Sequence, residues 1–235
     1  MFGPLKGYLW SPSYNYDYFT GDYEDEVTLK HFYSWLKPTT VFYDLGANVG
    51  FFSVLACKYI TNGTIYSFEP IPYNVVFFKK HIELNRKKIG NQSIEILPYA
   101  IADKEGEISI SHDQVAIEGN TYVHSEYLTT TDRITVPCHS IDGLLIEGYK
   151  QPDVIKIDVE GAEYDVLKGA EKTLRECKPN ILLATHDCHL PGVKQNCIDF
   201  LHAIGYTTTK LSGHNKHVPG LEDYIAIYEQ NEGKK

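Results

Sequence analysis

The segment Asp44-Leu-Gly-Ala-Asn-Val-Gly50 has the residue types of a strand-to-helix turn that binds a nucleotide or a nucleoside. Gly46 and Gly50 bracket the turn, and glycine lets the backbone approach a ligand without a Cβ clash. Asp44 lies at the end of the preceding apolar run, where a carboxylate can anchor a cationic amino group. Glu69 follows the next apolar run, nineteen residues after Gly50, where a carboxylate can accept hydrogen bonds from both hydroxyls of a ribose. These residues together predict a site for a nucleoside that carries an ammonium group.

A nicotinamide dinucleotide is the alternative ligand for this turn, and an oxidoreductase is then the alternative function. A loop that binds such a dinucleotide has the pattern G-x-G-x-x-G. The three glycine positions of this pattern fall here on Gly46, Asn48 and Phe51. Because two of the three glycines are missing, close approach of a pyrophosphate is compromised. Tyr164 and Lys168 have the spacing of a short-chain dehydrogenase pair, but this spacing arises readily by chance on a helix. The turn therefore favours the nucleoside.

Two further residues have the chemistry to activate an acceptor. Asp158 follows the apolar run 154–157, and His186 follows the run 181–184. Histidine titrates near neutrality and is the commonest general base. An aspartate before a helix is equally typical of an N-cap, so capping is the structural alternative for Asp158.

Glu160 and Glu163 lie between these two candidates, at the start of a predicted helix. Carboxylates in a first helical turn are favoured by the helix dipole alone, so a structural role is expected for both. Asp158, Glu160 and His186 can also converge as ligands for Mg²⁺ or Mn²⁺, which bind carboxylate oxygen and water. Nothing in the spacing requires a metal, and the metal ligands stay unassigned.

Apolar runs alternate with helical patterns along most of the chain. We predict strands at 41–45, 64–68, 94–97, 108–110, 134–136, 154–157, 181–184, 206–211 and 224–228, and helices at 24–36, 51–60, 72–85, 162–176 and 193–203. Such alternation indicates a doubly wound, mostly parallel α/β sheet, and the last two strands predict a C-terminal antiparallel hairpin. Ligands of such sheets bind beyond the carboxyl ends of the strands. The residues that follow the strands are therefore expected along one edge.

The composition fits a single enzyme domain. We assign residues 1–235 to one domain, with an aromatic-rich segment at 1–23, which covers a groove or packs on the core, and a catalytic core at 24–235. The five cysteines form no CxxC pair, which predicts free thiols and a cytoplasmic location. No apolar run has the length of a membrane span. The net charge of −9 repels polyanions and disfavours nucleic acid as a partner.

Four segments of the chain resemble the FkbM-type methyltransferases. They are Phe42–Phe52, Ser67–Pro70, Tyr99–Asp103 and Lys156–Glu163, and the similarity extends from about residue 23 to residue 186. The first segment alone indicates only the broad methyltransferase class, whereas its combination with Lys-Ile-Asp-Val-Glu-Gly-Ala-Glu is specific. The resemblance implies a Rossmann-like class I methyltransferase fold and S-adenosylmethionine as the cofactor. It also implies O-methylation of a hydroxyl group on a sugar or a natural product.

By position, the resemblance assigns seven residues to the cofactor site. Asp44, Gly46, Asn48 and Gly50 would contact the methionine part, Glu69 the ribose, and Pro70 and Ala100 the adenine. Family members often carry a glutamate shortly before the histidine that ends the fifth strand, and this chain has Ala184 there. The expected protein is an O-methyltransferase that acts on a small-molecule or glycan acceptor, with Asp158 and His186 as catalytic residues. A noncatalytic module that binds the cofactor is a second alternative.

Overall fold

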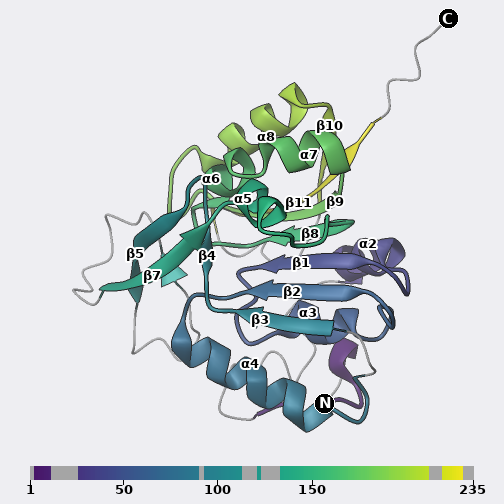
Figure 1. Ribbon diagram of the computed structural model, residues 1–235. Coiled ribbons are helices and arrows are strands. Elements are labelled where there is room, and N and C mark those ends of the chain that lie inside the picture. The colour runs from purple at the N-terminus through teal and green to yellow at the C-terminus, as the bar shows by residue number, and fades with distance from the viewer. Residues whose placement is uncertain are drawn as a thin grey trace, which may run out of the picture.

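The computed structural model describes residues 3–11, 26–89, 93–112, 121–122, 133–211 and 219–229 (Figure 1). Its elements in chain order are η1 (Gly3–Leu5), α2 (Glu26–Trp35), β1 (Val41–Leu45), α3 (Phe51–Ala56), β2 (Thr64–Phe68), α4 (Pro72–Asn85), β3 (Ser93–Leu97), β4 (Ala100–Ile101), β5 (Gly106–His112), β6 (Thr121–Tyr122), β7 (Arg133–His139), α5 (Ile141–Ile146), β8 (Val154–Ile157), α6 (Glu163–Lys168), α7 (Glu171–Cys177), β9 (Asn180–His186), α8 (Val193–Ala203), β10 (Tyr206–Lys210) and β11 (Leu221–Tyr228). Within this described part of the chain, no helix has the length and apolar character to cross a membrane.

Seven strands form the main sheet, in the order β10-β11-β9-β8-β1-β2-β3 (Figure 1). The strands from β9 to β3 are parallel to their neighbours, and β11 is antiparallel to both β9 and β10. The predicted mostly parallel sheet and its C-terminal antiparallel pair are confirmed. The strand order reverses between β1 and β8, so the carboxyl ends of these two strands flank the position where such sheets bind ligands.

Successive residues of β1 point to opposite faces of the sheet and enter two separate hydrophobic cores. Phe42 packs against Phe32 of α2, with ring centroids 5.1 Å apart, in the core that also contains the residues of α3. Tyr43 packs against Tyr66 of β2, with centroids 5.3 Å apart, in the core that contains α5, α6, α7 and α8. Helices therefore cover both faces, as a doubly wound sheet requires.

A smaller sheet follows β3, with the strand order β4-β7-β5-β6. Sequence patterns predict parts of β5 and β7, and the structure extends both strands to seven residues. The short helix α5, which follows β7, is not predicted. The hydroxyl of Ser140 caps it by accepting a hydrogen bond of 3.0 Å from the backbone nitrogen of Gly143. Because α5 buries only Ile141 and Leu144, it has no extended apolar periodicity.

The prediction of one helix at 162–176 is wrong, because the structure divides it into α6 and α7. The division lies at Gly169 and Ala170. A Cβ on Gly169 would lie 2.0 Å from the backbone oxygen of Ala102, so the chain there lies directly against the loop that follows β4. The break thus depends on a contact between distant segments.

The described N-terminal residues pack along α4. Trp10 is 6% exposed and stacks on His81, with ring centroids 3.6 Å apart. His81 accepts a hydrogen bond of 3.1 Å from the backbone nitrogen of Ser11 and donates one of 2.9 Å to the backbone oxygen of Val49. Burial lowers the pKa of His81 to about 4, so this bridge contains a neutral imidazole. The part of the aromatic segment at 12–23 lies outside the described residues.

Candidate active site

The loop between β1 and α3 has a backbone conformation that its sequence permits. Gly46 and Gly50 have φ values of 71° and 91°, and Asn48, a residue type that tolerates the left-handed region, has a φ of 51°. A Cβ on Gly46 would lie 1.8 Å from the backbone oxygen of Asp158, and one on Gly50 would lie 2.2 Å from the ring of Phe78. The fold itself therefore requires both glycines, independently of the predicted approach of a ligand.

Asp44 lies beneath this loop and is fully buried. Its Oδ2 accepts a hydrogen bond of 2.5 Å from Ser53, and its Oδ1, which has no hydrogen-bond partner among the described residues, lies 3.6 Å from Nζ of Lys156. Burial raises the pKa of Asp44 against the opposing influence of Lys156 and Ser53. The structure thus places Asp44 as a support of the loop. Its predicted contact with the methionine part of a cofactor stays a prediction.

Lys156 is a site residue that the sequence analysis missed. It stands beside Asp44 in the strand register, donates a hydrogen bond of 2.7 Å to the backbone oxygen of Gly46, and lies 3.2 Å from Oδ2 of Asp158. Burial lowers the pKa of Lys156, but Asp158 and Asp44 outweigh burial and raise it, so the ammonium group stays charged. The sequence contains a signal for this role. Lys156 lies two residues before Asp158, so the two side chains are expected on the same face of a predicted buried strand.

Glu69 directly follows β2 and is 4% exposed. Its Oε2 accepts a hydrogen bond of 2.7 Å from the backbone nitrogen of Asn48, and its Oε1 accepts bonds of 2.9 Å from Ile71 and 3.1 Å from Asn74. Burial raises the pKa of Glu69 to about 7, although these hydrogen bonds lower it. A carboxylate oxygen can accept two hydrogen bonds, so Oε2 retains acceptor capacity beside the loop. This position fits the predicted contact with a ribose.

The two residues predicted at the adenine belong to different segments. Pro70 follows Glu69 and is partly exposed, whereas Ala100 begins β4 and is buried. Ala100 shares a small hydrophobic core with Ile71, the residue after Pro70. The structure therefore brings the segments that carry Pro70 and Ala100 together near Glu69. Their contact with adenine stays a prediction.

A second cluster of polar side chains lies at the carboxyl ends of β8 and β9. Nε2 of His186 is 3.5 Å from Oδ1 of Asp158 and 3.3 Å from Oε2 of Glu160. Nδ1 of His186 is 2.7 Å from Oε1 of Glu163, which is fully buried. The structure thus brings together the two residues predicted to be catalytic and adds Glu160 and Glu163, for which the sequence analysis expects structural roles.

The surrounding carboxylates control the protonation of His186. Burial lowers its pKa, but Glu160, Glu163 and Asp158 outweigh burial and raise the pKa to about 10. The imidazole is therefore protonated at neutral pH in this arrangement, and it can act as a base only after it loses that proton. Burial raises the pKa of Asp158, but Lys156 and His186 outweigh burial and lower it, so this carboxylate is ionised. The role of His186 as the general base stays a prediction.

The structural alternative for Asp158 is wrong, because this residue does not cap the helix that follows. The N-cap residue of α6 is Ala162, and no side chain caps this helix. The chain first passes through Glu160 and Gly161, whose φ values are 55° and 106°. This turn delays the helix and leaves the carboxylate of Asp158 to contact His186.

A hollow of about 650 Å³ lies between η1 and α2. It is lined by Gly3, Pro4, Glu26, Leu29, Lys30, Tyr33 and Ser34. Because α2 lies where β1 begins, this hollow is at the other end of the strand from the loop that follows β1 (Figure 1). It contains none of the predicted site residues.

The strand order, with the antiparallel strand β11 between β10 and β9 at one edge of a parallel sheet, is that of a Rossmann-like α/β methyltransferase fold. The fold matches that of the solved methyltransferase FkbM from Methylobacillus flagellatus KT with a TM-score of 0.57 and 15% identity, over 82% of this chain and 44% of the other. It matches precorrin-6y C5,15-methyltransferase from Geobacter metallireducens GS-15 with a TM-score of 0.54 and 14% identity, over 96% and 95% of the two chains. At these identities the matches show the fold alone.

The chain belongs to the FkbM methyltransferase domain family, whose profile matches residues 44–208. It is 31% identical to the hexuronic acid methyltransferase AglP of Haloferax volcanii over 193 residues, which are 82% of this chain and 72% of the relative. It is 22% identical to methyltransferase 1 of Beauveria bassiana over 207 residues, with 80% of each chain covered. The predicted family is confirmed, and the chain is an S-adenosylmethionine-dependent methyltransferase. The oxidoreductase and the noncatalytic module are left without support.

Proposed function

We propose that this enzyme transfers a methyl group from S-adenosylmethionine to a hydroxyl group of a saccharide or a similar small acceptor. The relative named as a hexuronic acid methyltransferase, which aligns with most of this chain, supports a sugar as the acceptor. The net charge of −9 weighs against a polyanionic acceptor such as nucleic acid.

One contact carries the proposal. The loop after β1 lies against the end of β8 so closely that a Cβ on Gly46 would be 1.8 Å from the backbone oxygen of Asp158. The loop predicted to hold the cofactor and the carboxylate predicted to activate the acceptor therefore share one edge of the sheet. Methyl transfer requires the acceptor oxygen, the methyl carbon and the sulfur to be held in line, and the proximity of the two predicted sites supports such an arrangement.

The residues of this edge have distinct roles in the proposed reaction. The sulfonium group of the cofactor supplies an electrophilic methyl group when bound. A sugar hydroxyl is a poor nucleophile because it holds its proton tightly near neutral pH. The ionised carboxylate of Asp158 accepts a hydrogen bond from this hydroxyl and orients its oxygen. His186 takes up the proton when its Nε2 is neutral, and Glu163 fixes the orientation of the imidazole ring.

The proposal is tested by methyl transfer to a panel of acceptors. The purified protein is incubated with S-adenosylmethionine and with neutral monosaccharides, hexuronic acids, sugar nucleotides or transfer RNA, and the release of S-adenosylhomocysteine is measured. We expect transfer to a sugar and a product that survives mild alkali, because a methyl ether resists hydrolysis and a methyl ester does not. An alkali-labile product would place the methyl group on a carboxylate and refute the hydroxyl assignment. Transfer to RNA alone would refute the saccharide.

Substitution of Asp158 tests the catalytic half of the site. We expect Asp158→Asn to lower kcat by about 100-fold or more, because it removes a charged group that contacts the acceptor. The dissociation constant of S-adenosylmethionine, measured by calorimetry, should change much less than kcat. A variant with wild-type kcat would remove Asp158 from the mechanism.

A further inference from the structure

The side chains of Asp158, Glu160 and His186 come from the ends of β8 and β9 and point one ligand atom each at a common centre. These three atoms all lie within 4.8 Å of one another. Ligand atoms of one octahedral ion lie about 3 Å apart in neighbouring positions and about 4 Å apart across the ion. The observed separations therefore match those of a shared ion with only small movements of the side chains.

Glu163 orients the imidazole ring of His186 by binding the ring nitrogen that faces away from Asp158 and Glu160. Glu163 is fully buried, and its Oε1 binds both Nδ1 of His186, at 2.7 Å, and the backbone nitrogen of Gly161, at 2.9 Å. With Nδ1 occupied in this way, Nε2 is directed at the carboxylates of Asp158 and Glu160. A buried carboxylate on the far nitrogen of a histidine is the usual support of a metal-binding imidazole, because it fixes the ring and increases its basicity. Glu163 is not one of the three proposed ligands, so its contact with His186 adds a fourth residue that supports the site.

The charge of the cluster also favours a cation. This network contains four carboxylates, those of Asp44, Asp158, Glu160 and Glu163. Among the described residues, the lysine that pairs with them is Lys156, which contacts Asp44 and Asp158. The second oxygen of Glu163 is buried and has no hydrogen-bond partner within the described part of the chain. The four carboxylates outnumber the positive charges of Lys156 and protonated His186, and Oε2 of Glu160 also lies 3.1 Å from Nε2 of His189.

We propose that Asp158, Glu160 and His186 bind one divalent cation, with Glu163 as the residue that positions His186. Two carboxylates and one imidazole suit Mn²⁺ better than Mg²⁺ or Ca²⁺, which prefer oxygen ligands alone. A divalent cation in this place would replace the proton on Nε2 of His186 and lower the pKa of an acceptor hydroxyl that binds to it, so the ion and not the imidazole would then activate the hydroxyl. This role rests on the proposed function, whereas the binding of the ion does not.

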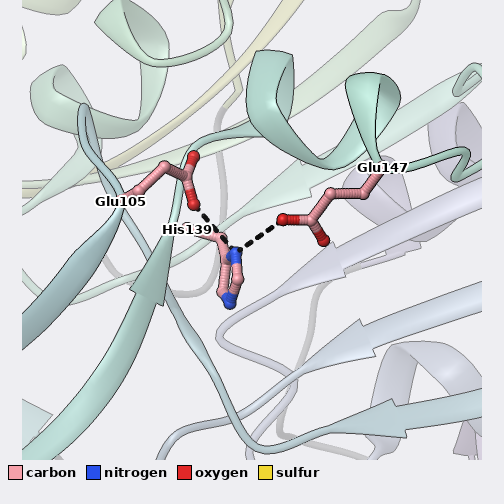
Figure 2. A group of neighbouring side chains, drawn as sticks. All are labelled: Glu105, His139 and Glu147. Atoms are coloured by element: carbon pink, nitrogen blue, oxygen red, sulfur yellow. Dashed lines mark ion pairs between the residues drawn. The ribbon is translucent and has the colours of Figure 1, made fainter.

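A second group, Glu105, His139 and Glu147, provides an internal control (Figure 2). Both carboxylates face the same nitrogen, Nδ1 of His139, at 2.9 Å and 3.7 Å, and their side chains are 49% and 50% exposed. Among the described residues, no carboxylate holds Nε2 of His139 from behind. We therefore expect this group to bind Mn²⁺ much more weakly than the buried site.

The test is a titration of the chelator-treated protein with Mn²⁺, followed by the electron paramagnetic resonance signal of the free ion. We expect one tightly bound Mn²⁺ per chain in the wild type and in His139→Gln. Glu160→Gln and Asp158→Asn should each weaken binding by about 10-fold or more, and Glu163→Gln by about 10- to 100-fold. Thermal unfolding of each variant verifies that it is folded. Glu160 is partly exposed, so Glu160→Gln carries the test even if Asp158→Asn does not fold.

Three results would overturn the proposal: no tight Mn²⁺ binding to the wild type, full binding by Glu160→Gln, or loss of binding in His139→Gln. The titration uses neither cofactor nor acceptor, so its outcome is separate from that of the proposed function. A chain that binds Mn²⁺ at this cluster but transfers no methyl group would refute the function and retain the metal site. Full methyl transfer by a protein that binds no Mn²⁺ would refute the metal site and retain the function.

Discussion

Glu69 offers a quantitative test of the cofactor site, because its protonation is coupled to its predicted role. Its pKa is raised from 4.5 to about 7 by burial. About one tenth of the carboxyl group is then ionised at pH 6 and about nine tenths at pH 8. A ribose hydroxyl donates its hydrogen bond to the ionised form. We therefore expect the affinity for S-adenosylmethionine to rise by about tenfold between pH 6 and pH 8.

The perturbation is Glu69→Gln, which removes the charge and keeps the shape. A hydrogen bond to a charged group contributes about 1.5–3 kcal/mol, so the affinity at pH 8 should fall by about 10- to 100-fold. The pH dependence due to Glu69 should disappear from the variant. Calorimetry at pH 6, 7 and 8 measures both effects, and any titration of the ligand itself is common to the two proteins. If the variant keeps the wild-type affinity and pH profile, Glu69 does not bind the ribose.

The same substitution affects stability, with a defined sign. Because the folded protein binds the proton of Glu69 more tightly than the unfolded chain, the contribution of Glu69 to the stability of the ligand-free protein is fully present below pH 4.5 and is lost as the pH rises to about 7. The full effect is on the order of 3 kcal/mol. Urea unfolding of the variant should lack this part of the pH dependence. An identical decline in both proteins would contradict the assigned cause.

Three other substitutions test the supports of the site. Gly46→Ala forces a Cβ against a backbone oxygen at positive φ, so we expect it to lose about 3 kcal/mol or more of stability in urea unfolding; an unchanged midpoint would contradict this packing. Trp10→Ala removes the ring stacked on His81 and should cost about 3 kcal/mol and raise the Kd of the cofactor severalfold; an unchanged Kd would uncouple Trp10 from the loop. Lys156→Met leaves the carboxylate of Asp44 buried without its cation and should cost about 3–5 kcal/mol at pH 7. This last loss should shrink as the pH falls and the carboxyl group of Asp44 takes up a proton, and a loss that does not change with falling pH would refute the ion pair.

Much of the fold was predictable because apolar runs end sharply at turn residues. The bounds of β1, β2, β8, α4 and α8 agree with those predicted from the sequence. The strands and α8 each bury a mostly apolar, continuous or periodic set of side chains, so their patterns are local, whereas α4 also buries Asn74, His81 and Asn85. The break between α6 and α7 depends instead on the contact of Gly169 with Ala102, which no local pattern contains.

The same contrast between local patterns and long-range contacts applies to the candidate site. Asp44, Glu69 and Asp158 were identifiable because they lie at or next to strand ends, which the sequence locates well. Lys156 was given no role, and Glu163 only a structural role at the start of a helix, because their partners come from other strands and are known only when the register is known. A charged residue inside an apolar run, such as Lys156, indicates that a partner of opposite charge lies on a neighbouring element.

The position of β11 has a consequence for the order in which the protein folds. During translation β10 emerges before β11, yet β10 joins the main sheet only through β11. Until β11 emerges, the outer edge of β9 is unpaired and open to other chains. His186, at the end of β9, pairs with Leu221 of β11, so the polar cluster at the ends of β8 and β9 is completed only after β11 emerges. A nascent chain that stalls before Leu221 would therefore expose the edge of β9 to pairing with other chains.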